Sequence, residues 1–136
     1  MRKGFTLIEM LVVVMIVAAL AGFAIARFEE SRTRTFFAAM KADLRQLADQ
    51  QEIYYSTHWY TYAGSAGQAA DAVPELQFTN SQGVYTVFRA AGTAGWSAES
   101  THSGLNGATQ KCAMFYGSAP PLPPAGTNGL VSCMGE

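Results

Sequence analysis

A single carboxylate stands inside a long apolar run near the start of the sequence. Thr6 and Glu9 are the only polar residues between Phe5 and Ala26. An acidic side chain costs about 2.5–3.5 kcal/mol deep in a membrane and less near the interface. A carboxylate in this setting needs a cationic partner, because two paired charges compensate each other where water is scarce. A plain membrane anchor would be better without this carboxylate, so the position of Glu9 requires an explanation.

Two cysteines, Cys112 and Cys133, flank a proline-rich stretch close to the C-terminal end of the sequence. A disulfide between them would stabilise the fold by about 3 kcal/mol in the chain-entropy model. Proline-rich chain pairs poorly into a sheet, so a covalent bond is a plausible way to hold it. Two cysteines and two widely spaced histidines do not match a zinc site. We therefore predict a disulfide and no metal.

The remaining ionisable residues form no catalytic pattern. The sequence lacks a nucleophile elbow, a phosphate loop, a zinc-protease motif and a calcium loop. Asp71, Glu75 and Glu99 are isolated in sequence, and His102 lies in a glycine-rich stretch that predicts a loop. His58 has no neighbour at ligand spacing, which predicts a structural role. We expect neither enzymatic activity nor a cofactor.

The role of Glu9 depends on the structure and location of the apolar run 5–26 that contains it. As a helix it would extend about 33 Å, close to the thickness of a bilayer core. One interpretation is a secretory leader with Arg2 and Lys3 as its basic start and cleavage after Ala26, but the run exceeds the usual apolar length of about 7–15 residues. A second is a plain membrane anchor. Neither interpretation explains Glu9.

The string "RKGFTLIEM" resembles the class III signal of type IV pilins and type II secretion pseudopilins. In that family a prepilin peptidase cuts after a glycine, and the new N-terminal phenylalanine is N-methylated. The matching positions are Gly4, Phe5 and Glu9. The resemblance implies that Glu9 pairs with the Phe5 amine of a neighbouring subunit and so sets the register of assembly. Many members carry a helix-bending proline where this chain has Ala26, so we expect a straighter helix, with any unwinding in the filament near residues 18–24.

A second helical pattern follows directly on the first. Residues 27–56 contain neither proline nor glycine, and apolar residues recur mostly at spacings of three and four. They are Phe37, Met40, Leu44, Leu47, Ile53 and Tyr54, with Lys41, Asp43, Arg45, Asp49 and Glu52 on the expected polar side. The mixed charges at 29–34 are interpreted as a solvated linker, or alternatively as inter-subunit pairs. The aromatic residues at 54–62 are interpreted as core and loop anchors, or alternatively as stacking groups between subunits.

Short β-like runs replace the helical period after residue 72. Candidate strands are Leu76–Thr79, Val84–Ala90, Gly95–Ser100 and Cys112–Tyr116. We predict an α+β fold in which a long N-terminal helix packs on a small antiparallel β-sheet head, as in pilins. The predicted divisions are a leader at 1–4, a membrane or filament-core half at 5–26, an amphipathic half at 27–56 and a β head at 57–136.

These patterns together favour a structural subunit of a filament. The prediction is a type IV pilus subunit that is held in the inner membrane and then polymerises into an extracellular homo-oligomeric filament for adhesion, motility or uptake. The family resemblance implies a prepilin peptidase, an assembly ATPase and a platform protein as partners. Alternatives are a type II secretion pseudopilin and a DNA-binding competence pilin. The chain has 9 basic and 10 acidic residues, a balance that does not favour nucleic acid as a partner.

Overall fold

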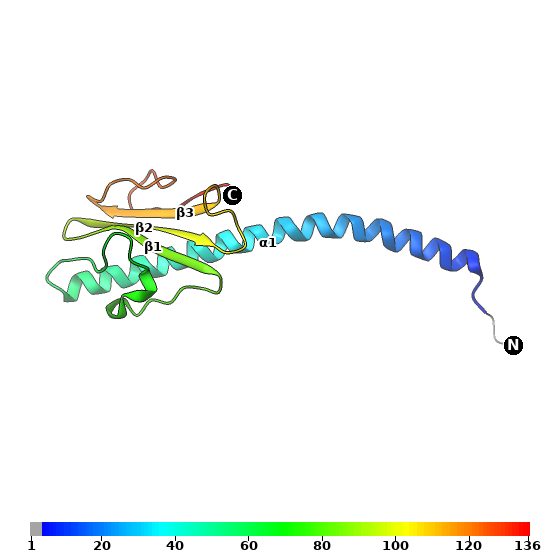
Figure 1. The fold of residues 1–136 in the computed structure, drawn as a ribbon, viewed down its shortest axis with the longest axis horizontal. Coiled ribbons are helices and arrows are strands. Elements are labelled where there is room, and N and C mark those ends of the chain that lie inside the picture. Colours follow the sequence, from blue (N-terminus) through cyan, green and yellow to red (C-terminus); the bar gives the residue numbers. More distant parts are fainter. Residues whose placement is uncertain (1–3) are drawn as a thin grey trace. The chain divides into compact units, whose positions relative to one another are not determined.

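The computed structural model describes residues 4–136, so most of the expected leader lies outside the described residues. The helix α1 spans Leu7–Thr57, and the short 3-10 helices η1 and η2 span Ala70–Ala72 and Pro74–Leu76. Four strands follow, β1 Val84–Ala91, β2 Gly95–His102, β3 Lys111–Gly117 and β4 Ser132–Met134 (Figure 1). The chain divides into two compact units, Met1–Thr33 and Arg34–Glu136.

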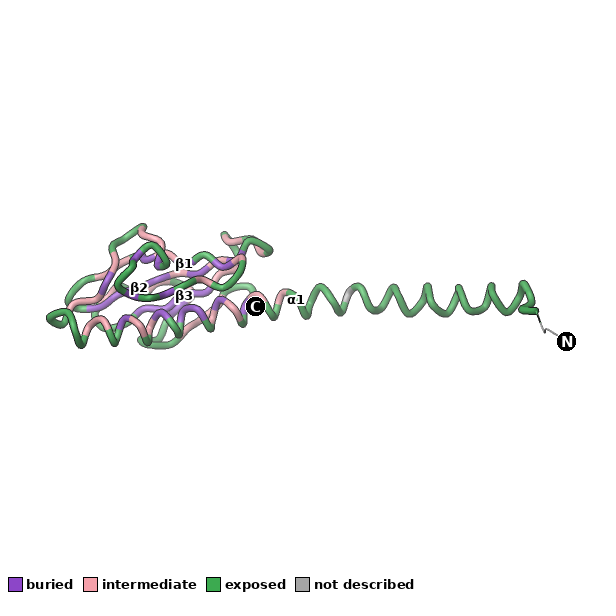
Figure 2. Tube along the Cα trace, turned by 90° about the horizontal axis from the view of Figure 1, so that it is seen from below, coloured by how far each residue is buried: buried purple, intermediate pink, exposed green. Residues whose placement is uncertain are grey.

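In the first unit, α1 continues without interruption through Gly22. Every described side chain from Gly4 to Arg32 is exposed, which Figure 2 shows as an unbroken green tube apart from one grey position. Among the described residues, the first part of α1 therefore contributes no side chain to a core.

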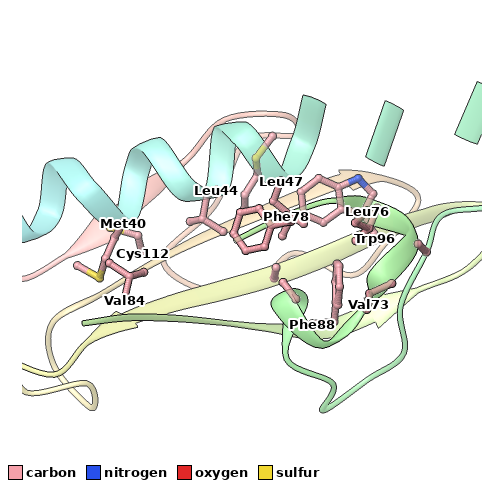
Figure 3. Close-up of a cluster of buried hydrophobic side chains, with 14 of the residues drawn as sticks. Met40, Leu44, Leu47, Val73, Leu76, Phe78, Val84, Phe88, Trp96 and Cys112 are labelled. Atoms are coloured by element: carbon pink, nitrogen blue, oxygen red, sulfur yellow. The ribbon is translucent and has the colours of Figure 1, made fainter. Parts of the chain in front are cut away.

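In the second unit, one face of α1 packs on the sheet. Phe37, Met40, Leu44 and Leu47 are at most 1% exposed, and their spacing of three and four places them on one side of the helix. They share a core with residues of the loop and the strands, including Leu76, Phe78, Val84, Phe88, Trp96 and Cys112 (Figure 3). The predicted α+β fold, a long helix packed on an antiparallel sheet, is confirmed.

The sheet is an antiparallel meander in the order β1-β2-β3-β4. Val84, Thr86 and Phe88 of β1 are buried while Tyr85 and Arg89 are exposed, as the alternation of the sequence predicts. The register with β2 shifts between Phe88 and Ala90, where the strand has an irregularity.

The two faces of β3 serve two different cores. Cys112 and Met114 belong to the core beneath α1, whereas Ala113 and Phe115 pack with Leu122 and Ala125. Because successive strand residues point to opposite faces, the proline-rich segment covers the face of the sheet that α1 leaves free. This segment contains a cis peptide bond between Pro123 and Pro124.

One predicted strand is absent, and one strand of the structure was not predicted. Leu76–Thr79 is not a strand: Leu76 ends η2, and Phe78 lies in the following loop. Both side chains are buried, so their alternation reflects two anchors in a loop and not a pleated strand. The prediction also missed β4, whose Cys133 lies opposite Cys112.

Asp43 and Ile53 differ from the prediction for α1, which said nothing of Gln51. Asp43 is buried, and it accepts hydrogen bonds from the Ser81 amide at 2.7 Å and the Ser81 hydroxyl at 2.6 Å. Gln51 is buried as well, and its amide group exchanges two hydrogen bonds with the backbone of Ala63. Ile53, which the prediction placed in the apolar stripe, is 58% exposed. Both polar side chains fix loops onto the helix, a role that apolar periodicity does not reveal.

The prediction of a loop at His102 is also wrong. His102 ends β2 and is buried against the Phe36 ring, with the ring centroids 3.9 Å apart. Its Nδ1 accepts a hydrogen bond from the Gly104 amide at 2.9 Å, so the ring holds the turn that follows β2.

Candidate functional site

Gly4, Phe5 and Glu9 lie together at the start of the described chain. Gly4 and Phe5 precede α1, and Glu9 lies in its first turn. All three are exposed, and the Phe5 side chain is 77% exposed. An exposed backbone before a helix is accessible to a peptidase, whereas a bond within a helix is held in the hydrogen-bonded ladder.

Glu9 has a local partner that sequence analysis did not identify. Its Oε2 accepts hydrogen bonds from the Thr6 amide and the Thr6 hydroxyl, each at 2.8 Å. The Thr6 hydroxyl in turn accepts a bond from the Glu9 amide at 3.3 Å. This is a capping box, in which a threonine and a glutamate three residues later satisfy free N–H groups at a helix start. The pattern T-L-I-E at residues 6–9 is the signal that could have predicted it.

The capping box describes the carboxylate in the uncut chain. There, the Phe5 nitrogen is a peptide amide bound to Gly4 and carries no charge. Cleavage after Gly4 would turn that nitrogen into an amine, which is cationic in water at neutral pH. A positive group four residues before Glu9 would then exist for the first time, and the helix dipole also favours a negative side chain in this turn.

The segment that carries Glu9 is long and apolar enough to cross a membrane. An 18-residue window of α1 has a mean hydropathy of 2.7, and none of that window is buried within the chain. The apolar segment of a leader peptide can also reach this length and hydropathy. Together with the signal at its start, this helix fits a membrane-anchored precursor.

Charged residues follow the apolar run on α1. Arg27 pairs with Glu30 at 3.3 Å, three residues apart on the exposed helix. The Arg32 guanidinium lies over the Phe28 ring, 5.9 Å from its centroid. Exposed pairs of this kind contribute under about 1 kcal/mol, so they do not decide the stability of the helix.

The expected disulfide is present in the structure. Cys112 of β3 is bonded to Cys133 of β4, with their Cα atoms 4.0 Å apart. The bond lies across a strand pair and joins the end of the chain to the sheet. Nearby, Lys41 of α1 binds the Glu136 carboxylate at 2.6 Å, so the last residue is held as well.

Glu99, which the sequence suggests is isolated, joins three strands. Its carboxylate binds Arg89 of β1 and Lys111 of β3, the latter at 3.2 Å. Partial burial raises the pKa of Glu99, but hydrogen bonds from Arg89 and Lys111 outweigh burial and lower the pKa overall. Within residues 4–136, His, Cys, Asp and Glu side chains form no group of three that could hold a metal.

The aromatic residues near the end of α1 divide into two sets. Tyr55 stacks on Tyr62 at a centroid distance of 4.5 Å, and Tyr62 contacts Tyr116 edge to face. Burial, followed by the negative charge of Glu52, raises the pKa of Tyr62 to about 12. Trp59 and Tyr60, in contrast, are 94% and 69% exposed. Tyr60 still contacts the Tyr55 ring edge to face, with the ring centroids 5.4 Å apart, so the interpretation as core and loop anchors fails for Trp59.

The comparisons with known proteins support the N-terminal part of this site. No curated protein matches the chain. Residues 1–25 match the family model of the prokaryotic N-terminal methylation motif, which includes Gly4, Phe5 and Glu9. The motif implies processing by a prepilin peptidase and assembly into a filament, and it indicates a structural protein. The chain thus carries the class III signal shared by type IV pilins and type II secretion pseudopilins.

Proposed function

We propose that this protein is a structural subunit of a type IV pilus, cut after Gly4 and assembled through the first part of α1. The observation that carries the proposal is the combination of the methylation motif with the first part of α1, where every described apolar side chain up to Phe28 is exposed. Such a surface needs lipid before assembly and neighbouring helices afterwards, because water solvates it poorly. The protein acts as a building block and not as an enzyme.

The charge of Glu9 sets the register in this proposal. When subunits leave the bilayer, the carboxylate moves away from Thr6 and pairs with the Phe5 amine of a neighbour. A subunit in the wrong register leaves a carboxylate and an amine without partners in an apolar bundle. Because an unpaired buried charge is strongly unfavourable, misplaced subunits are rejected. The peptidase, the assembly ATPase and the platform protein are the expected partners.

The disulfide between Cys112 and Cys133 supports a pilus over a secretion pseudopilus. Pilins that the signal resembles often close their C-terminal loop with a disulfide, whereas major pseudopilins usually hold that region with calcium. Deleting the gene for this protein in its source cell would distinguish a pilus subunit from a secretion pseudopilin. We expect loss of surface fibres with normal export of secreted enzymes, and the reverse pattern would indicate a pseudopilin.

The role of Glu9 is tested with a variant that keeps the capping hydrogen bonds of its side chain and removes its negative charge. Glutamine at the third helical position can also complete a capping box, so Glu9→Gln keeps the cap and removes the charge. We expect Glu9→Gln and Glu9→Ala to be processed and held in the membrane but absent from sheared fibres. Glu29→Gln, which removes an exposed carboxylate from α1 beyond the apolar run, is the matched control and should assemble normally. Wild-type fibre yield from Glu9→Gln would refute the register role and leave only a cap.

A further inference from the structure

A hollow of about 340 Å³ lies beside the C-terminal end of α1. Its volume falls at the lower end of the range for small-molecule sites, about 300–1,000 Å³. Gln50, Ile53, Tyr54 and Thr57 line it from one face of α1, because their spacing follows the helical period. His58 just after the helix and Glu75 and Gln77 around η2 complete the lining. All seven residues belong to the second unit.

One wall of the hollow is held in place by internal contacts. The Tyr54 and His58 rings stack with their centroids 3.9 Å apart and their planes within 1°. His58 Nδ1 lies 2.8 Å from the Thr57 hydroxyl and 3.2 Å from the Tyr54 carbonyl. A ligand meeting this wall would not have to order it, which reduces the entropic cost of binding.

Three polar side chains of the lining have no partner among the residues that the structure describes. Among residues 4–136, Gln50, Glu75 and Gln77 make no hydrogen bond or ion pair through their side chains. They supply two amide groups, each a donor and an acceptor, and one carboxylate that only accepts when ionised. These groups are therefore available to a ligand.

Backbone strain is concentrated on both sides of the hollow. Trp59, Tyr60 and Gln77 are the non-glycine residues with positive φ among those that the structure describes, at 54°, 58° and 47°. A left-handed conformation is unfavourable for side chains of this size and persists mainly where the surroundings enforce it, often at functional sites. Gln77 lies in the lining, and Trp59, one residue after His58, is 94% exposed.

The chemistry of the lining selects the kind of ligand. Glu75 is its one charged residue, so phosphate and carboxylate ligands are repelled. An ammonium group only donates hydrogen bonds, so it could use the carbonyl oxygens of the two glutamine amides but not their N–H groups. The hydroxyl groups of a neutral sugar both donate and accept, and the apolar face of the sugar ring suits Ile53 and the Tyr54 ring.

We propose that this hollow binds a neutral saccharide, with Gln50, Glu75 and Gln77 contacting its hydroxyl groups. The assignment goes beyond assembly and would hold for the isolated subunit. It would give a filament of these subunits a repeated sugar-binding surface, whose avidity for a glycan that occupies several sites at once exceeds the affinity of one site.

The test is an NMR titration of the full isotope-labelled chain in detergent micelles. The probes are glucose, galactose, mannose and N-acetylglucosamine, with methylammonium and inorganic phosphate as charged comparators. At least one neutral sugar should shift the Tyr54 and His58 resonances, with a Kd on the order of 1 mM, which is typical of weak binding to one small site. No shift with any of these sugars at 50 mM, or a stronger response to either charged probe, would overturn the proposal.

Matched variants then locate the binding. Gln77→Gly removes an amide at a position where glycine relieves the backbone strain, so the fold is retained. Gln50→Ala removes the second amide, and Gln46→Ala, an exposed glutamine of α1 outside the lining, is its control. We expect Gln77→Gly and Gln50→Ala each to weaken binding about tenfold, while Gln46→Ala leaves it unchanged. Equal sugar binding by the wild type and all three variants would show that the sugar binds elsewhere and would refute the assignment.

Discussion

The two parts of α1 have the same secondary structure and opposite surfaces. Up to Arg32 every described side chain is exposed, although most of the run is apolar, whereas from Phe37 to Leu47 one stripe is almost completely buried (Figure 2). The second part obtains its apolar contacts from its own sheet. None of the described side chains of the first part is buried, so its apolar surface is available to lipid and, in our proposal, to neighbouring subunits. Substitutions in the two parts should therefore affect different properties.

The largest expected effect on the stability of the head comes from a leucine in the buried stripe. Leu44→Ala should destabilise the head by about 2–5 kcal/mol, because it leaves a cavity beneath α1. Leu11→Ala removes the same atoms from a side chain that is 53% exposed and should change the stability by less than about 0.5 kcal/mol. Thermal unfolding of the head in detergent measures the stability of both variants. Similar losses of stability in Leu44→Ala and Leu11→Ala would show that the first part of α1 contributes to the stability of the head.

The disulfide should contribute the next largest effect, since the strand pair that it joins has only three residues on one side. The double variant Cys112→Ser/Cys133→Ser should lose about 3 kcal/mol of stability. Limited proteolysis should then cut first between residues 117 and 131, because β4 and the proline-rich segment are no longer bound to β3. Reduced wild type should behave in the same way, and resistance to the protease in both would show that packing alone holds this segment.

A smaller loss is expected where α1 holds a loop through a polar contact. Asp43→Ala removes the acceptor of the Ser81 amide and should cost about 1–3 kcal/mol, the usual cost of an unsatisfied buried donor. Asp49→Ala, on the exposed side of α1, is the matched control and should have little effect. Hydrogen exchange at the Ser81 amide provides a local readout, and unchanged protection in Asp43→Ala would contradict this contact.

The smallest effect concerns the charges on the sheet. Because the pKa of Glu99 is lowered in the folded state, its contribution is present above the unfolded pKa of about 4.3 and is lost as the pH falls through the folded value. Glu99→Gln should lower the stability at pH 7 by under about 1 kcal/mol, since the ion pairs are partly exposed. It should also reduce the loss of stability on acidification below about pH 4. A variant with the acid profile of the wild type would rule out this role.

The features that the sequence predicted well depend on local pattern. The period of the apolar residues predicted α1 and its buried stripe, and the alternation from Val84 to Arg89 predicted β1 and its faces. The pair of cysteines predicted the disulfide, because few other roles fit two cysteines beside a proline-rich stretch. In each case the physical cause is a short-range constraint that leaves a repeated or paired signal.

The features that were missed depend on contacts between distant segments. Asp43 and Gln51 resemble surface residues until the loops that they bind are in place, 38 and 12 residues away. β4 is too short to show an alternation and forms where Cys133 meets Cys112. The capping box at Thr6 is the exception, since its signal, the string T-L-I-E at residues 6–9, is local.

The central claim is that the chain is cut after Gly4 and then assembled. Intact mass and N-terminal sequencing of the protein in a sheared cell-surface fraction test this claim most directly. The account predicts a chain that begins at N-methylated Phe5 and contains the Cys112–Cys133 bond. A chain that begins at Arg27 would contradict it, because the apolar run would then be a removed secretory leader and Glu9 would have no role in the mature protein.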